Sequence, residues 1–351
     1  MSFEDGWAAL NLEMPKRVPR TEYSAEFHWE LIRAVTAIDI RSDSQEDLQS
    51  TAAGAFVRAW NYDLIWATPV KVDFGKWETS MGHAVYMDGG VDYDNRISCP
   101  FHSPEEVLAF DPLVSLPHKD KSEIIAHAEA RYAKDCAANP TVVNMTGIYN
   151  TCMSGLIQML GWDMLLMTAG LAPEEFGRFT NRYCQWIGRY FEAVAETKIP
   201  VVMIHDDIVW MSGAFLHPEW YKRFVFPNYK RFFAPLIESG KKILFTSDGN
   251  YTEFIDDVAA CGVDGFVLEP ATDMKYIADK YGATHAMIGN ADTRILLSGP
   301  KSAIRAEVER CMSIGKRCPG FFMAVGNHIP PNTPVENALY YNDVYLELSV
   351  R

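Results

Sequence analysis

The sequence predicts an α/β protein of the (β/α)8 TIM-barrel class, and two observations carry this prediction. Short apolar runs alternate with helical patterns along most of the chain, as parallel strands joined by helices do. Polar side chains directly follow most of these runs, as where 243–246 (ILFT) leads into Ser247 and Asp248. In barrels of this class the active site lies at the carboxyl ends of the strands.

Seven runs have the length and composition of strands. They are residues 63–68, 141–146, 201–205, 243–246, 265–269, 286–289 and 321–325. The stretch 70–117 is irregular and rich in Gly, Asp and aromatic residues, so we expect hairpins or a long insertion there, with room for the eighth strand. A doubly wound open sheet is the alternative, but no GxGxxG motif opens a helix after the first run.

Helical patterns fill the intervals between these runs. We expect helices from Ser24 to about 35, from 44 to 60, after Ser103, at 121–138, 151–168, 173–197, 218–239, 252–261, 273–281 and 301–313, and after Thr333. Residues 1–23 are expected to form an irregular N-terminal arm. No linker rich in Gly, Ser or Pro interrupts the series, so we expect residues 1–351 to form one domain.

The composition excludes several classes of protein. The 351 residues include 46 acidic and 32 basic side chains, and the resulting net charge of −14 disfavours binding to nucleic acid or an anionic membrane. No apolar run reaches the ~18 residues of a membrane span, and the first residues lack the pattern of a signal peptide. Seven scattered cysteines without a CxxC pair indicate free thiols. We therefore expect a cytoplasmic protein.

The residues that follow the predicted strands are candidates for the functional site. They include Asn144, His205, Asp206, Asp207, Asp248, Glu269, Asn290, Asp292, Asn327 and His328. Carboxylates and histidines that converge from different strands can bind a metal or perform acid–base chemistry. The plainer alternatives are turn formation and helix capping around Asp248, and a buried loop role for one of Asp206 and Asp207.

The helical stretch 173–197 carries an aromatic stripe. Its members are Phe176, Phe179, Tyr183, Trp186, Tyr190 and Phe191. Such a stripe is typical of a core or of an interface between subunits, which makes a homodimer conceivable.

Five segments of the C-terminal half carry a family resemblance. They are IHDDIVWMSGAFLHPEWYKRFVFPNYKRF (204–232), ILFTSDGN (243–250), GVDGFVLEP (262–270), MIGNADTRILLSGP (287–300) and VGNHIPPNTPVENA (325–338). In order and spacing they resemble the uroporphyrinogen decarboxylase superfamily, and more closely its corrinoid-linked methyltransferase branch than the true decarboxylases. The resemblance implies a TIM barrel.

The N-terminal stretch indicates which branch of the superfamily the chain resembles. True decarboxylases of the superfamily carry an arginine-rich loop near the start, which holds the carboxylates of a porphyrinogen. Here the region reads RVPRTEYSAEFHWEL, with Glu22 and Tyr23 where further positive charge would be needed. The opening RVPRTEYS is instead similar to methyltransferase I of the anaerobic bacterial systems that demethylate methoxylated aromatics.

The superfamily's zinc motif is replaced in this chain. Thiol-activating members bind zinc through His-x-Cys and a distant Cys, where this chain has Thr246, Asp248 and Asn327. The change disfavours activation of a thiol. Asp248, Glu269 and His328 would form a nitrogen and oxygen set for zinc instead, and a metal held in this way polarises an ether oxygen.

The resemblance implies that the enzyme passes the O-methyl group of a methoxylated aromatic to the Co(I) corrinoid of a partner protein. His205 or Asp206 would protonate the leaving oxygen. Substrate contacts are expected from Tyr23, Asn144, Trp210, Asn290 and Asn327. The alternatives are transfer from a methylcorrinoid to a thiol or tetrahydrofolate, a decarboxylation of the uroporphyrinogen type, and a corrinoid-docking module without activity.

Overall fold

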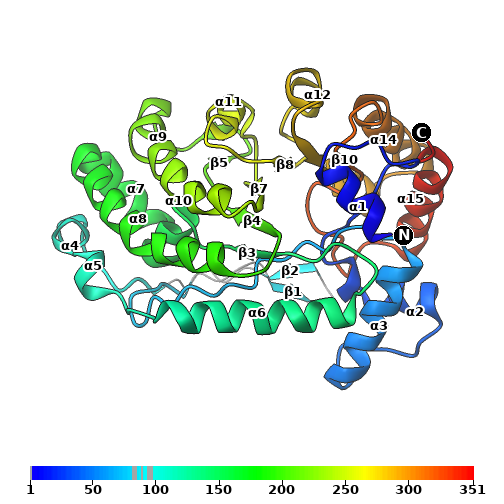
Figure 1. Ribbon diagram of the computed structural model, residues 1–351, viewed down its shortest axis with the longest axis horizontal. Coiled ribbons are helices and arrows are strands. Elements are labelled where there is room, and N and C mark those ends of the chain that lie inside the picture. The colour runs from blue at the N-terminus through cyan, green and yellow to red at the C-terminus, as the bar shows by residue number, and fades with distance from the viewer. Residues whose placement is uncertain (1, 81–84, 88–89, 93–97) are drawn as a thin grey trace.

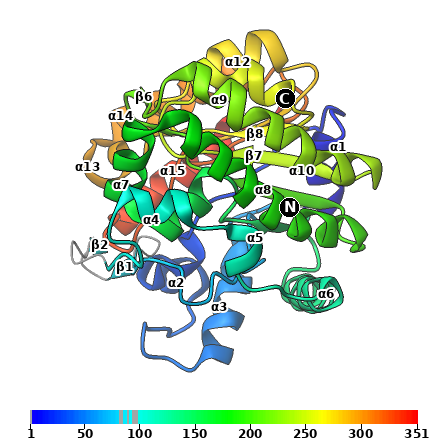
Figure 2. The ribbon, with the colours of Figure 1, turned by 90° about the vertical axis from the view of Figure 1, so that its left-hand side faces the viewer.

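The computed structural model describes residues 2–80, 85–87, 90–92 and 98–351. Figure 1 shows the strands at the centre of the molecule and the helices arranged around them, and the view turned by 90° in Figure 2 shows the same outer layer. Among the described helices none is long and apolar enough to cross a membrane.

Six parallel strands form the main sheet, in the order β10-β9-β8-β7-β4-β3. Their bounds are β3 Thr146–Ile148, β4 Val201–His205, β7 Lys242–Thr246, β8 Gly265–Val267, β9 Ala286–Ile288 and β10 Phe321–Phe322. Nearly all residues of these strands are buried and most of them are apolar, as expected for parallel strands covered by helices. The fold is a TIM barrel, as predicted.

The six strands fill six of the eight strand positions of the barrel ring. Shorter segments occupy the other two. The predicted strand 63–68 pairs with the third strand only through isolated parallel bridges, Leu64 with Val143 and Val70 with Ile148. On its other side, the amide of Asp63 donates to the carbonyl of Arg20 over 2.8 Å.

The N-terminal stretch closes the ring and takes the position of the eighth strand, for which 70–117 was expected to have room. Arg20 pairs in parallel with Met323, and Tyr23 with His328, so that residues 20–23 lie between β10 and 63–68. Among its described residues, 70–117 holds an antiparallel hairpin instead, β1 Val85–Met87 and β2 Gly90–Asp92.

The helices lie between successive strands, and most predicted ranges are confirmed to within a few residues. Their bounds are α1 Phe3–Leu10, η1 Ala25–Phe27, α2 Trp29–Thr36, α3 Glu46–Ala59, α4 Pro104–Ala109, α5 Pro112–Ser115, α6 Lys121–Ala138, α7 Met153–Leu171, α8 Pro173–Glu196, α9 Pro218–Phe224, α10 Phe226–Glu238, η2 Thr252–Phe254, α11 Ile255–Ala259, α12 Met274–Tyr281, α13 Thr293–Ser298, α14 Lys301–Gly315 and α15 Val335–Leu348. A second short hairpin, β5 Val209–Trp210 and β6 Gly213–Ala214, follows β4.

Three local predictions were wrong. The N-terminal arm is not irregular throughout, because Ser2 caps α1 by accepting the amide of Asp5. Ser24 has a left-handed backbone and caps no helix, whereas the His28 ring caps α2 at the amide of Leu31. The predicted helix 218–239 is divided before Pro227, since proline begins a helix more readily than it continues one.

Residues 20–23, which form the first strand of the ring, are held in place by a buried ion pair. The guanidinium of Arg20 lies 2.9 Å from the carboxylate of Glu22, and both side chains are fully buried. The same guanidinium packs over the rings of Trp60 and Tyr345, at 4.4 and 4.6 Å from their centroids. A buried charge needs such partners. Arg20 and Glu22 therefore both have a structural role in the barrel wall.

The aromatic stripe of α8 lies in the core. All six of its rings are buried, and Phe191 stacks on Phe232 of α10 with centroids 4.3 Å apart. The stripe therefore offers no surface to a second subunit, and this ground for a homodimer is withdrawn.

Candidate active site

A cavity of ≈ 500 Å³ lies at the carboxyl ends of the barrel strands. Its wall is built from residues at or just beyond the carboxyl ends of seven of the eight strand positions, the first two among them. The residues that matter most for its chemistry are Tyr23, Trp66, Lys71, Tyr149, His205, Asp248, Asn327 and His328. Aromatic rings and charged groups thus share one small space, as in many ligand sites.

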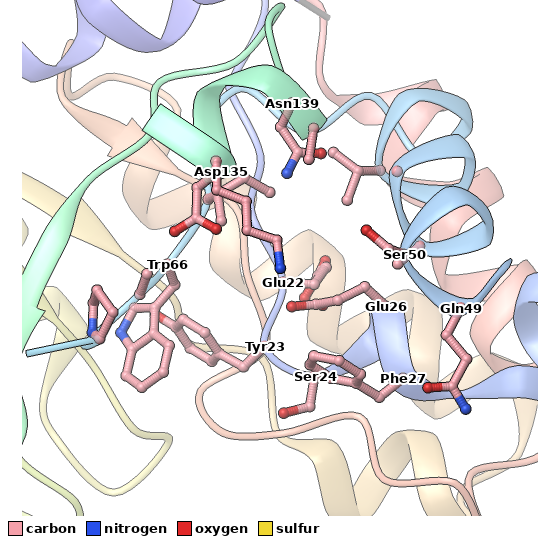
Figure 3. Close-up of a pocket in the computed structure, with 18 of the residues that line it drawn as sticks. Glu22, Tyr23, Ser24, Glu26, Phe27, Gln49, Ser50, Trp66, Asp135 and Asn139 are labelled. Carbon is pink, nitrogen blue, oxygen red and sulfur yellow. The ribbon is translucent and has the colours of Figure 1, made fainter. Parts of the chain in front are cut away.

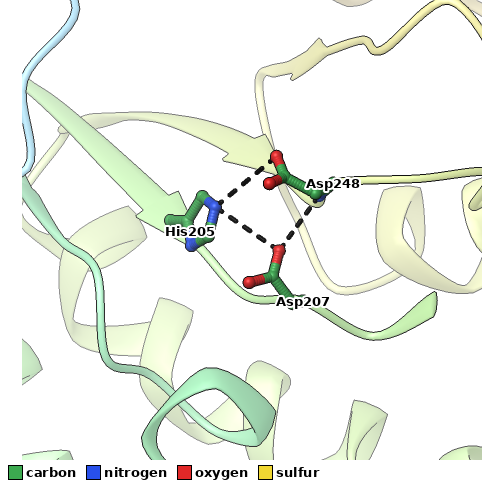
Figure 4. Close-up of side chains that lie close together, drawn as sticks. All are labelled: His205, Asp207 and Asp248. Carbon is green, nitrogen blue, oxygen red and sulfur yellow. Dashed lines mark hydrogen bonds and ion pairs between the residues drawn. The ribbon is translucent and has the colours of Figure 1, made fainter. Parts of the chain in front are cut away.

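Strand register brings three polar side chains together at this cavity (Figure 4). Two of them, His205 and Asp248, line its wall, and Asp207 lies beside them. His205 ends β4 and is paired with Thr246, which ends β7. Asp207 and Asp248 each lie two residues beyond that pair, so they extend from neighbouring strands at the same level. The amide of Asp248 donates to a carboxylate oxygen of Asp207 over 3.1 Å, which fixes the two loops to each other.

His205 faces both carboxylates with the same nitrogen. Its Nε2 lies 3.4 Å from Oδ1 of Asp207 and 3.9 Å from Oδ1 of Asp248. The His205 side chain is 4% exposed, while that of Asp248 is 59% exposed. The trio therefore runs from the buried floor of the cavity to its solvent-facing rim.

The charges of the trio alter one another's proton affinity. Burial lowers the pKa of His205, but the negative charges of Asp207 and Asp248 outweigh burial and raise that pKa to about 9. Burial raises the pKa of Asp207 to about 6, although the imidazole opposes the change. At neutral pH the imidazole is thus protonated and held between two carboxylates, a state suited to donating a proton.

Asp206 does not share this position, although it was predicted as a catalytic residue. Its carboxylate is fully buried and accepts from the amide of Ser154, at the start of α7, over 2.6 Å, and from the hydroxyl of Tyr229. Burial raises its pKa, and these hydrogen bonds oppose the rise. Asp206 anchors α7 and α10 to the end of β4, whereas its neighbour Asp207 contacts His205.

The predicted metal set of Asp248, Glu269 and His328 is not brought together. Glu269 accepts from the amide of Gly249 over 2.8 Å and from the side-chain amide of Asn327, so it braces two loops. Burial and the charge of Asp248 raise the pKa of Glu269 to about 7. His328 lines the cavity, and its Nδ1 lies in hydrogen-bond contact with the hydroxyl of Ser24. Burial lowers its pKa.

The predicted substrate contacts divide into two groups. Tyr23 and Asn327 line the cavity. Asn144 instead donates to the carbonyls of residues 139 and 142, and Asn290 ties the loop after β9 to Glu269, Thr272 and Arg310. Trp210 is 44% exposed on the β5–β6 hairpin and packs against Trp162 and Phe215.

Several cavity residues were not predicted. Tyr149 follows β3 directly and stacks on His205, while Trp66 and Lys71 belong to the segment after the second strand position. Tyr149 and Lys71 lie just beyond predicted strands and Trp66 lies near the end of one, so inspection of the strand ends could also have found them.

The trio also fits a metal ion in ligand type. Among the described residues, His205, Asp207 and Asp248 are the group whose possible ligand atoms all lie within 4.8 Å of one another. One imidazole and two carboxylates suit zinc or another ion that accepts nitrogen and oxygen ligands. Of the predicted set, Asp248 belongs to this group, whereas Glu269 and His328 do not.

Comparison with known proteins identifies the family of the chain. The family described as uroporphyrinogen decarboxylase (URO-D) matches residues 80–345. The uroporphyrinogen decarboxylase of Carboxydothermus hydrogenoformans is 29% identical over 219 residues, which cover 62% of this chain and 61% of that enzyme. A Thermus thermophilus uroporphyrinogen decarboxylase is 28% identical over 172 residues, covering 49% of this chain and 48% of its own.

Among solved structures, a methyltransferase from Methanosarcina mazei has the same fold, with a TM-score of 0.64 over 99% of both chains at 16% identity. The matched segments thus span less than two thirds of the curated relatives. The family match alone extends over most of the barrel, including every strand of the main sheet. The chain belongs to the uroporphyrinogen decarboxylase family.

Proposed function

We propose that this protein is a methyltransferase that removes the O-methyl group of a methoxylated aromatic compound and passes it to the Co(I) corrinoid of a partner protein. One observation carries the proposal, namely the protonatable His205 between Asp207 and Asp248 in the wall of a cavity lined by aromatic rings. The corrinoid is the second substrate, and it would approach over the open rim of the barrel.

The cavity suits a flat, small substrate. Its volume of ≈ 500 Å³ accommodates one substituted ring, and Tyr23, Trp66 and Tyr149 offer surfaces for stacking. Tyr23 and Trp66 already pack edge to face, with centroids 5.4 Å apart. A methoxyarene that replaces water between such rings gains from apolar burial.

The N-terminal arginines argue against a porphyrinogen substrate. Arg20 is fully buried and paired with Glu22, and Arg17 is paired with Asp63. Neither is among the described residues that line the cavity. A substrate rich in carboxylates would instead meet the negative charge of Asp248 in the wall of the cavity.

The proposed reaction requires that the leaving oxygen be stabilised. When the acceptor attacks the methyl carbon, the carbon–oxygen bond breaks and its electron pair remains on the oxygen. His205 Nε2 would donate its proton to that oxygen, while Asp207 and Asp248 hold the imidazole in its charged form until transfer. Alternatively, a zinc ion held by the same three side chains would take the place of that proton and would polarise the ether oxygen as a Lewis acid.

Two other reactions remain as candidates. The curated relatives are uroporphyrinogen decarboxylases, which favours release of carbon dioxide from a carboxylated substrate. Methyl transfer in the reverse direction, from a methylcorrinoid to tetrahydrofolate or a thiol, uses the same cavity, but the strand ends lack the thiolate ligands of thiol-activating members.

A spectroscopic assay separates these reactions. Purified protein is mixed with a reduced corrinoid, free or on its carrier protein, and with a panel of methoxyarenes, and the corrinoid spectrum and carbon dioxide are followed. Methylation of the corrinoid that depends on the methoxyarene and falls at least ~100-fold in His205→Gln is expected. The control His285→Gln, outside the cavity and just before β9, should keep its activity. Carbon dioxide release without a corrinoid would instead establish a decarboxylase.

A further inference from the structure

A second cavity of ≈ 510 Å³ lies beside the first, between the 3-10 turn η1 and helices α3 and α6. Figure 3 shows Tyr23 and Trp66 close together on one side of it, with Gln49 and Ser50 across from them and Asn139 above. Tyr23, Ser24, Trp66 and Thr68 line both cavities, so the two spaces adjoin along these residues.

Unsatisfied polar atoms gather in the wall of this second cavity. Four buried side-chain atoms there have no hydrogen-bond partner among the described residues: the hydroxyl of Tyr23, Oε2 of Glu26, Nε1 of Trp66 and Oδ1 of Asn139. Tyr23 is itself only 6% exposed. Buried polar atoms are nearly always paired, so four unpaired atoms on residues that line one cavity point to a bound molecule that completes them.

The four atoms define the kind of group that would pair with them. The indole nitrogen of Trp66 only donates, the amide oxygen of Asn139 only accepts, and the hydroxyl of Tyr23 does both. Glu26 accepts when ionised and donates when protonated, and burial raises its pKa to about 7, so both forms occur at neutral pH. A hydroxyl group, which donates and accepts, is complementary to every member of this set.

The rest of the wall is aromatic. The rings of Phe27 and Trp29 line the cavity with those of Tyr23 and Trp66. Flat apolar surfaces select a flat apolar ligand, because ring pairs gain both from burial and from their preferred stacked or edge-to-face geometry. Glu22, although it faces the same space, is already paired with Arg20 and Tyr341.

We propose that this cavity is a second ligand site, which binds the ring of a hydroxylated aromatic compound, a phenol or catechol. That ring belongs either to the distal end of a two-ring substrate whose methoxy ring occupies the first cavity, or to a separate phenolic molecule such as a demethylated product. Only the choice between these sources rests on the proposed function, since binding itself requires no turnover.

Binding of phenol and catechol is measured by calorimetry on the full chain, without a corrinoid and with a methoxyarene saturating the first cavity. Ala53 of α3 lines the second cavity, and Ala59 lies exposed at the end of the same helix, so Ala53→Phe and Ala59→Phe form a matched pair. Ala53→Phe should weaken phenol binding at least tenfold, and Ala59→Phe should leave it unchanged. Equal affinities in both variants would overturn the proposal.

A second variant tests the same cavity in case Ala53→Phe does not fold. Ser50→Phe fills the same cavity from an exposed position on α3 and should also weaken phenol binding. Glu26→Leu should lower the affinity for phenol relative to toluene, because it removes a hydrogen-bonding partner and keeps the apolar wall. An unchanged phenol-to-toluene ratio would contradict the assignment of a hydroxylated ligand.

Kinetics then distinguish the two sources. A two-ring ether with a methoxy group at one end and a phenol at the other should show a KM raised about tenfold in Ala53→Phe, while a one-ring methoxyarene keeps its KM. If the two KM values respond alike, the second ring is a separate molecule. If no methoxyarene reacts at all, the proposed function fails while the binding result stands by itself.

Discussion

The imidazole of His205 stacks on the phenol ring of Tyr149, with ring centroids 3.9 Å apart and planes inclined by 16°. The Nδ1 atom of the same imidazole is buried and has no hydrogen-bond partner among the described residues. The stacking contact, rather than a hydrogen bond to Nδ1, therefore sets the plane of the ring, and with it the direction of Nε2 toward the cavity.

We predict that Tyr149→Leu lowers kcat for demethylation about tenfold, because the aromatic surface that orients His205 is lost, at a cost of roughly 0.5–1.5 kcal/mol. Tyr149→Phe preserves the surface and should stay within about twofold of the unmodified enzyme. Steady-state kinetics of the two variants provide the comparison. Equal losses in both would show that the hydroxyl, and not the stacked ring, is what His205 requires.

Asp207→Asn should move the pH dependence of the reaction. The charge of Asp207 is the largest influence that raises the pKa of His205 to about 9, so its removal lowers that pKa. The reaction needs protonated His205 and is lost as pH rises through this pKa. The basic limb of the kcat/KM profile should thus shift about 1 unit toward lower pH. The control variant Asp279→Asn, at an exposed position on α12, should leave the profile unchanged. A shift toward higher pH would refute the role given to the imidazolium.

Zinc binding should release a proton. A histidine must be neutral to ligate a metal, and His205 is protonated near neutral pH because its pKa is about 9. Calorimetric titration with zinc in two buffers of different ionisation enthalpy should therefore report release of about one proton per ion. Asp248→Ala should weaken zinc binding at least tenfold. Tight binding without proton release would exclude His205 from the ligands.

Arg20→Met should destabilise the barrel by about 3–5 kcal/mol, because it leaves the carboxylate of Glu22 buried without its partner. Arg33→Met is the control, since Arg33 forms an exposed pair with Glu30 over 3.7 Å, which is worth only about 0–1 kcal/mol. Urea unfolding measures both changes. If Arg20→Met costs no more than its control, the first strand is held by backbone pairing alone.

Much of the barrel could be predicted from the sequence, because its central strands are buried on both sides and therefore read as uninterrupted apolar runs. The first strand escaped prediction for the opposite reason. Residues 20–23 (RTEY) are polar in sequence and buried in structure, since Arg20 and Glu22 neutralise each other within the wall. Pairing of this kind depends on contacts from distant segments, which no local pattern records.

The site was predicted in position but only partly in composition. The sequence located His205, Asp206 and Asp207 at one strand end, yet successive residues there point in different directions, and the register that aligns Asp207 with Asp248 comes from the pairing of β4 with β7. Glu269 was predicted as a metal ligand because a buried carboxylate requires a partner. Its partners proved to be the amide of Gly249 and the side chain of Asn327.

The closure of the ring by residues 20–23 has a consequence for how the chain folds. Glu22 accepts from the amide of Val325, across a sequence separation of 303 residues. During synthesis the first strand is made early, but its partner leaves the ribosome only near the end, so until then both flanks of the growing sheet stay open. Nascent chains are thus exposed to edge-to-edge association for most of their synthesis, and a holding chaperone should raise the yield of native protein more than any change to the cavity would.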